Sequence, residues 1–146
     1  MSVRLKRAAR LVELAETAER SARAQACAAE RALVEAREAA RESEGTWLAA
    51  AAVEGEVVVN AADLMDSEAY LRTLRARADA AQQKTEHASS EAGRCASEAL
   101  RAATERRKLE LWRDRIAEGD RVEENRRERI ASDELAARSA ARGRSL

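Results

Sequence analysis

The side chains of this chain that could carry out chemistry are few, and their spacing does not suit catalysis. His87 is the only histidine and stands among charged residues, as expected for a solvated surface position. Cys27 and Cys95 lack zinc-site spacing and are too few for a disulfide framework. The sequence contains neither a glycine-rich phosphate loop nor a nucleophile motif. We therefore expect no enzymatic activity, no metal and no cofactor.

Carboxylates are abundant, but arginines stand beside them at the intervals that form ion pairs along one helix. Glu123, Glu124 and Glu128 lie within a few residues of Arg121 and Arg127. Opposite charges three or four residues apart stabilise a solvated helix face. These carboxylates are accordingly predicted to be structural rather than general acids or bases.

The composition indicates long helices instead of a compact core. The 146 residues include no Pro, no Phe and only three aromatic side chains, while Ala, Glu and Arg dominate. These are strong helix formers, and a chain rich in them with a helical repeat is typical of a coiled coil. A charged disordered segment is the other interpretation, but the apolar spacing is too regular for it.

Apolar or small residues recur at three- and four-residue steps near the start of the chain. Two consecutive four-residue steps, through Ala22 to Ala26, predict a local stutter of the coiled coil. The pattern predicts a first helix at about residues 3–44. The residues of this series are Leu5, Ala8, Leu11, Ala15, Ala18, Ala22, Ala26, Ala29, Leu33, Ala36 and Ala40.

A second series alternates three- and four-residue steps throughout and predicts a helix at about residues 63–139, followed by a short basic tail at 140–146. It departs from apolar or small side chains at Thr85, Arg106 and Arg113, where we expect weaker contact. Its residues are Leu71, Leu74, Ala78, Ala81, Thr85, Ala88, Ala92, Cys95, Ala99, Ala102, Arg106, Leu109, Arg113 and Ile116.

Residues 45–62 interrupt the two patterns and are predicted to contain the chain reversal. Gly45, Gly55 and the valines at 57–59 favour a helix poorly. Asp63 is predicted to be the N-cap of the second helix. The expected fold class is therefore all-α, an elongated antiparallel two-helix coiled-coil hairpin.

A reversal centred near residue 61 also predicts which residues lie opposite each other. It would bring Cys27 across from Cys95, and Leu5 beside Ile116 or Ala117. Both cysteines are interpreted as small apolar residues of the interface between the helices rather than as a redox pair.

Charge is balanced but unevenly distributed. The chain has 27 basic and 27 acidic residues, so nucleic acid is not an expected partner. Residues 42–68 contain acidic side chains and no Lys or Arg. Basic residues mark both ends, and a folded-back chain would bring them together. They are Arg4, Lys6, Arg7 and Arg10 at the start and Arg138, Arg142 and Arg144 at the end.

The sequence contains no signal-peptide pattern and no apolar run of membrane-spanning length. With only two cysteines, a cytoplasmic and reduced protein is the expectation, one that reaches a membrane only through its partners.

The last third of the chain combines an anchor with a charged helix and a short terminal motif. The anchor is Lys108, Leu109 and Trp112, and the motif is Asp133, Glu134, Ala136 and Arg138. This order resembles the flagellar export protein FliJ and the related YscO group of type III secretion. Tyr70 and Leu74 resemble the aromatic-x-x-x-Leu start of the second helix in that family.

The resemblance implies a non-enzymatic stalk that inserts its joined termini into a hexameric export ATPase and promotes its activity. It also implies contact with the membrane export gate and with export chaperones. Tyr70 and Leu74 are the implied gate residues, although residues 39–44 lack the tyrosines that the family commonly has there. The residues assigned to ATPase docking are Arg4, Lys6, Arg7, Arg10, Lys108, Leu109, Trp112, Asp133, Glu134, Ala136 and Arg138.

Trp112 has two interpretations, packing between the helices or contact with a partner. Trp47, expected in the reversal, is equally open between capping the end of the hairpin and contacting a partner. For the whole chain the alternative is a generic coiled-coil spacer or a peripheral stalk subunit of a rotary ATPase. The flagellar and virulence-type export systems are not separated by the sequence.

Overall fold

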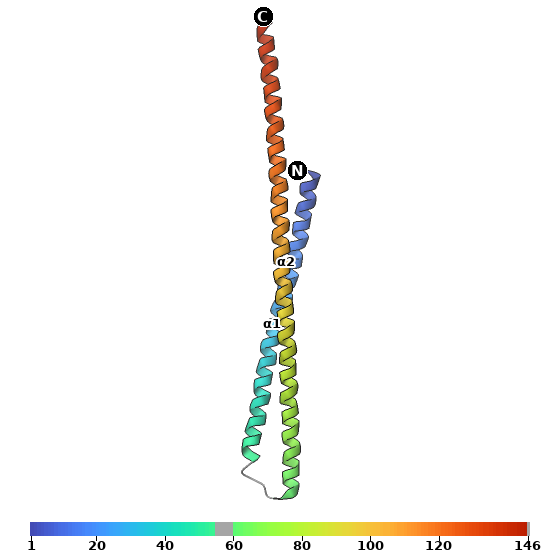
Figure 1. Cartoon of the computed structure of the whole chain (residues 1–146), viewed down its shortest axis with the longest axis vertical. Helices are drawn as coiled ribbons and strands as arrows, with labels where there is room; N and C mark the ends of the chain where they lie inside the picture. The colour runs from blue at the N-terminus through green and yellow to red at the C-terminus, as the bar shows by residue number, and fades with distance from the viewer. Residues whose placement is uncertain (55–59, 146) are drawn as a thin grey trace. The chain divides into compact units, whose positions relative to one another are not determined.

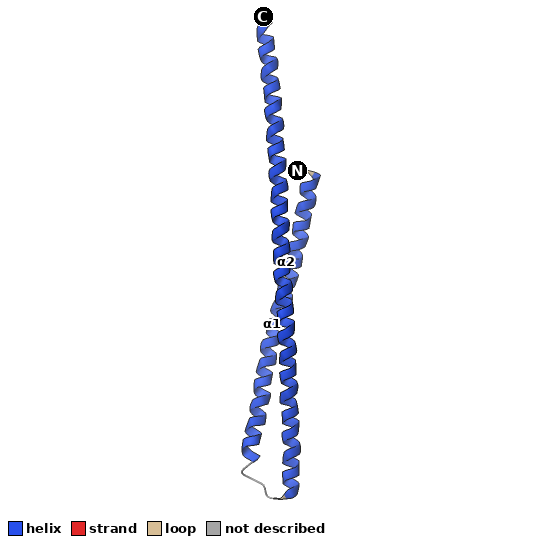
Figure 2. Cartoon of the chain, viewed as in Figure 1, coloured by secondary structure: helices blue, strands red, loops and turns tan. Residues whose placement is uncertain are grey.

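The computed structural model describes residues 1–54 and 60–145 of the chain. These residues form two helices, α1 (Val3–Glu54) and α2 (Ala61–Arg144). Figure 1 shows the two helices in chain order, and Figure 2 shows helix and loop but no strand among the described residues. The prediction of an all-α two-helix hairpin is confirmed.

α1 is longer than the sequence pattern predicted. It continues through Gly45 and ends at Glu54 rather than near residue 44. A helical glycine costs only about 1 kcal/mol relative to alanine, and the alanines at 49–52 are strong helix formers. Helix thus occupies the first part of the segment expected to be irregular. Gly55 and the valines at 57–59 lie outside the described residues.

The ends of α2 also differ from the expectation. Asn60 is the N-cap, because its Oδ1 accepts a hydrogen bond from the backbone N–H of Asp63 at 2.8 Å. Asp63 therefore stands in the first turn, where its negative charge interacts favourably with the positive end of the helix dipole. At the other end α2 continues past residue 139 to Arg144, with Arg142 and Arg144 in the last turn. Most of the predicted basic tail is helical.

The chain forms two compact units. The first unit combines Met1–Glu19 with Ala102–Leu146, and the second unit is Arg20–Arg101. Within the first unit α1 and α2 run antiparallel, since Ser2 bonds to Asp120 whereas the later Glu19 bonds to the earlier Arg106. Within the second unit the hydroxyl of Thr85 donates to the carbonyl oxygen of Ala36 at 3.0 Å, whereas the earlier Arg75 pairs with the later Glu44 at 4.0 Å. The antiparallel pairing predicted from the two repeats is thus present in both units.

The predicted α2 series forms the α2 side of the interface, which we call the seam. Each of its members, from Leu71 to Ile116, is buried or half-buried. Thr85 and Arg106, where weaker contact was expected, instead make hydrogen bonds across to α1. A polar side chain at a seam position is tolerated when a partner satisfies it, and both positions meet that condition.

The α1 side of the seam differs from the predicted series at two positions. Leu11 is 42% exposed whereas its neighbour Val12 is 2% exposed. Likewise Ala18 is exposed, while Glu19 is 5% exposed. With Val12 and Glu19 in the series, three- and four-residue steps alternate without interruption, and the predicted stutter is wrong. The apolar pattern misassigned this stretch because Glu19 is a charged residue in a buried position.

Only one of the two cysteines belongs to the seam. Cys95 is buried, as predicted, but Cys27 is exposed. The α1 seam passes through the adjacent Ala26, which turns Cys27 toward solvent. The expectation that both thiols occupy the seam and face each other is therefore wrong.

Candidate docking surfaces

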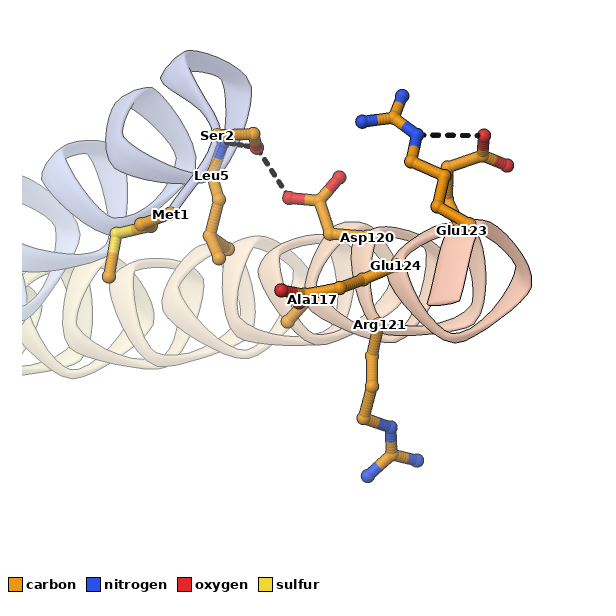
Figure 3. A pocket seen from close by; sticks show the side chains of 9 residues that line it. Met1, Ser2, Leu5, Ala117, Asp120, Arg121, Glu123 and Glu124 are labelled. Carbon is orange, nitrogen blue, oxygen red and sulfur yellow. Dashed lines mark hydrogen bonds and ion pairs between the residues drawn. The ribbon is translucent and has the colours of Figure 1, made fainter. Parts of the chain in front are cut away.

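The start of α1 is held against α2 by a serine that bonds in two directions. The hydroxyl of Ser2 accepts a hydrogen bond from the backbone N–H of Leu5 at 3.1 Å, which caps the helix. The same hydroxyl donates to the carboxylate of Asp120, and Figure 3 shows both bonds. Leu5 and Ala117 line one cavity of about 520 Å³ beside this contact. The predicted proximity of Leu5 and Ala117 is confirmed.

Beyond Asp120, α2 continues without a helix beside it in the described part of the chain (Figure 1). We call residues 121–144 the α2 tail, whose length is about 36 Å at ~1.5 Å per residue. Every residue of the tail is exposed, including Val122 at 58% and Leu135 at 65%. The seam spacing beyond Ile116 first reaches the charged residues Asp120, Glu123 and Arg127.

The predicted docking residues are divided between the tail and the paired helices. Asp133, Glu134, Ala136 and Arg138 are exposed on the tail. The basic residues of α1 are also exposed, but they stand on the paired part of the helix. They are Arg4, Lys6, Arg7 and Arg10.

The two basic ends of the chain do not meet. α1 begins beside Asp120, and Arg138 lies eighteen positions further along α2. At ~1.5 Å per residue these positions are about 27 Å apart. The expectation of a single basic pole formed by both termini is therefore wrong. The reason is that α2 extends well past the level at which α1 starts.

The predicted anchor lies at the edge of the seam. Leu109 is a half-buried seam residue, whereas Lys108 is exposed. Trp112 stands outside the seam positions Leu109 and Arg113 and is 37% exposed. Its indole is partly covered, so both packing and partner contact are compatible with its position. Leu111 beside it is 43% exposed.

A charged cluster inside the seam was missed by the sequence patterns. The guanidinium of Arg106 donates to the carboxylate of Glu19 across the seam and to Glu110 Oε1 at 2.7 Å on its own helix. The side chains of Glu19, Arg106 and Glu110 are 6%, 27% and 17% exposed. Arg106 interrupted the predicted α2 series, and that interruption was the signal for an acidic partner on α1.

Within the cluster, the pKa values of Glu110 and Arg106 depart from their ordinary values. Hydrogen bonds from Arg106 hold the pKa of the Glu110 carboxyl below its ordinary value of 4.5. Conversely, the bonds to Glu110 and then Glu19 raise the pKa of Arg106. Each partner therefore stabilises the charged form of the other.

The two predicted gate residues differ in exposure. Tyr70 is 58% exposed, whereas Leu74 is 5% exposed and packs in the seam. Only Tyr70 is therefore accessible to a partner. It contributes to a cavity of about 610 Å³ between the helices, lined by Thr46, Ala49, Ala50, Val53, Ser67, Tyr70 and Leu71.

Trp47 lies in α1 rather than in an irregular reversal. The guanidinium of Arg75 stands 4.5 Å from the centroid of its ring, within the range of a cation–π contact. Arg75 also pairs with Asp79 at 3.4 Å and Glu44 at 4.0 Å. Trp47 is thus half-buried in a contact between α1 and α2.

Residues 5–145 match the family model described as flagellar FliJ protein. The chain belongs to the flagellar FliJ family. This match covers α1 from Leu5 onward and all of α2, with the α2 tail and the cavity beside Tyr70. No curated protein and no solved structure matches the chain. FliJ membership associates the chain with the flagellar protein export machinery.

Two further observations describe what this FliJ-family chain can hold. Within residues 1–54 and 60–145, no group of three or more His, Cys, Asp and Glu side chains could bind a metal ion. Neither helix, over its described residues, has an apolar stretch long enough to span a bilayer. The candidate functional features of the described residues are the exposed tail and the cavity beside Tyr70.

Proposed function

We propose that this FliJ-family protein is the stalk of the hexameric ATPase of flagellar export, with its α2 tail inserted into the ATPase ring. The stalk promotes the activity of the ATPase and performs no hydrolysis itself. On the cytoplasmic side of the membrane it links the ATPase to the export gate and receives export chaperones.

The exposed α2 tail is the observation that carries this proposal. Val122, Ile130 and Leu135 are 58%, 49% and 65% exposed on a helix that no other described segment covers. A lone helix of about 36 Å gains little stability without a partner, because tertiary packing supplies most helical stability. A surrounding ring would cover all of its faces. This differs from docking by joined termini, since the tail alone enters the ring.

The basic residues of α1 have a separate role in this arrangement. Arg4, Lys6, Arg7 and Arg10 are exposed near the base of the tail. Charges at such a position steer association with an acidic surface at the mouth of the ring and are screened by salt. We therefore assign Asp133, Glu134, Ala136 and Arg138 to the inserted part and the α1 cluster to the rim.

The cavity beside Tyr70 is the proposed site of contact with the export gate. Tyr70 is accessible there, and Leu74 supports it from within the seam. Exposed acidic side chains lie close in sequence to the residues that line this cavity, so a gate segment with basic and apolar residues would fit it. They are Glu42, Glu44, Asp63, Asp66 and Glu68.

The test is stimulation of the purified export ATPase by a chain that ends at Asp120. Because every described residue of the tail is exposed, we expect its melting temperature to change by no more than ~2 °C. Stimulation of phosphate release should nevertheless be lost. Replacing Arg4, Lys6, Arg7 and Arg10 by Glu should weaken stimulation in a salt-dependent way.

A matched control replaces by Glu four exposed arginines elsewhere on α1. They are Arg20, Arg31, Arg37 and Arg41. This control should stimulate the ATPase as the unaltered chain does. Full stimulation by the chain ending at Asp120 would contradict insertion of the tail. A generic spacer would show no stimulation by any of these chains.

A further inference from the structure

We propose that the pair Glu19 and Arg106 determines how this chain pairs its helices. It selects the register of α1 against α2 and disfavours pairing of either helix with its counterpart in a second copy. This proposal concerns the assembly of the hairpin and is independent of docking to the ATPase or the gate.

The seam needs such a device because alanine dominates it. Between Ala15 and Ala40 on α1 and between Ala78 and Ala102 on α2, small residues occupy every seam position except Glu19 and Leu33. Sliding α1 by one heptad therefore replaces many alanine contacts by other alanine contacts. Packing alone discriminates poorly between such registers. A polar residue at a single seam position is a known means of specifying register in coiled coils.

The geometry of Glu19 and Arg106 meets the requirements of that role. Glu19 is 5% exposed, and its carboxylate accepts a hydrogen bond from the guanidinium of Arg106 on the other helix. Arg106 is held in place by a second bond to Glu110 at 2.7 Å. Separating the two residues removes the hydrogen bond across the seam from a carboxylate that α2 buries, which is unfavourable. A register that separates the two residues is therefore penalised.

The alternative registers can be compared directly. Sliding the helices by seven residues in one direction places Glu19 opposite Ala99. Sliding them in the other direction offers Glu19 the side chain of Arg113 but places Arg106 opposite Ala26. Of the three registers, the observed one matches both charges across the seam.

Pairing between two copies is disfavoured by the same residues. In a parallel pair of identical helices each seam residue meets its own counterpart. Two copies of α1 would bring Glu19 against Glu19, and two copies of α2 would bring Arg106 against Arg106. Like charges in a seam repel, so the pairing of α1 with α2 is the arrangement in which these charges attract.

The test replaces the pair by leucines, Glu19→Leu with Arg106→Leu, in the full chain. Hydrophobic replacement of a buried ion pair is often stabilising, so the melting temperature should rise by roughly 3–6 °C. Specificity should be lost at the same time. Light scattering should show self-association that the unaltered seam does not show.

Disulfide trapping reads the register, with Cys27 and Cys95 replaced by Ala in every variant. Ala15 is one seam step before Glu19, and Leu109 is one step after Arg106, so Ala15→Cys with Leu109→Cys reports the observed register. Ala15→Cys with Ala102→Cys reports a slide of one heptad. The slipped pair should crosslink several-fold more in the leucine variant than with the charges present.

The matched control places two leucines on the exposed pair Glu118 and Arg121, whose side chains are 57% and 70% exposed on α2. It should retain the observed register and oligomeric state. The proposal is overturned if the seam variant stays monomeric and crosslinks only in the observed register, or if the control behaves identically. If the leucine variant loses helical structure, the variant Glu19→Gln with Arg106→Gln tests the proposal instead, by the same light-scattering and crosslinking measurements.

Discussion

Replacing Val12 by alanine is expected to destabilise the protein more than replacing the larger Leu11. The reason is that the face of α1 carrying Val12 is turned toward α2. Val12 is 2% exposed whereas Leu11 is 42% exposed, so α2 covers the smaller side chain. An apolar pattern that ranks residues by size would place Leu11 in the seam and would predict the opposite order.

The magnitude for Val12 follows from a comparison with the lone α2 tail. Val122 on the tail is 58% exposed, so pairing covers nearly all of the surface that a valine shows on a single helix. Deleting two buried carbons costs about 1.6 kcal/mol at ~0.8 kcal/mol each, and the cavity adds to it. Because alanine is a better helix former than valine, the substitution also stabilises the helix by about 0.5 kcal/mol, which offsets part of this loss. The expected net loss is about 1–2 kcal/mol.

The same comparison predicts a smaller loss at Leu11. Leu135 on the tail is 65% exposed against 42% for Leu11, so pairing covers only about a third of the surface that a leucine shows there. Removing three fully buried carbons would cost ~2.4 kcal/mol, and a third of that is ~0.8 kcal/mol. Because alanine is the better helix former by ~0.2 kcal/mol, the expected loss in the free energy of unfolding is about 0.6 kcal/mol.

Urea denaturation followed by circular dichroism at the helix band measures both differences in the free energy of unfolding. Thermal melts should agree, with shifts of roughly 3–6 °C for Val12→Ala and about 2 °C for Leu11→Ala. A loss at Leu11 equal to or larger than that at Val12 would refute the reasoning. It would place Leu11 in the seam instead of Val12.

Two further predictions concern the charged cluster and the cavity beside Tyr70. Because Arg106 holds the pKa of Glu110 below 4.5, the stability from this carboxylate is present above that pH and is lost as the pH falls through the lowered value. Melting temperatures below pH 4.5 should therefore fall less steeply for Glu110→Gln than for the unaltered chain, and identical profiles would contradict this linkage. Tyr70→Ala should weaken capture of the export gate protein while shifting the melting temperature by no more than ~2 °C, since Tyr70 is 58% exposed. Leu74→Ala should instead destabilise the fold by about 2–5 kcal/mol, and equal stability losses at the two positions would contradict their assignment.

Much of the architecture follows from the sequence alone. Three- and four-residue steps alternate without a break along the α2 series from Leu71 to Ile116, and all of its positions are buried or half-buried in the structure. A strictly alternating repeat over many turns permits only one face to be buried. The family was likewise recognisable from short motifs such as Lys108, Leu109 and Trp112, and the family match covers residues 5–145.

The phase of α1 was decided by tertiary structure. Two frames compete near Glu19, one through Ala18 and one through Glu19, and residue type alone favours the alanine. The structure selects Glu19 because Arg106 stands across the seam to satisfy its charge. A pairing between residues so distant in sequence is invisible to a local periodicity.

The division between accessible and buried site residues was also decided by tertiary structure. Tyr70 and Leu74 are one helical turn apart, yet Leu74 is 5% exposed and Tyr70 is 58% exposed. In the same way, the start of α1 beside Asp120 leaves the α2 tail without a partner helix in the described chain. Periodicity determines which residues share a helix face. The start of the other helix decides which faces of a helix are covered and over what length. Contacts such as that of Ser2 with Asp120 fix where α1 begins along α2.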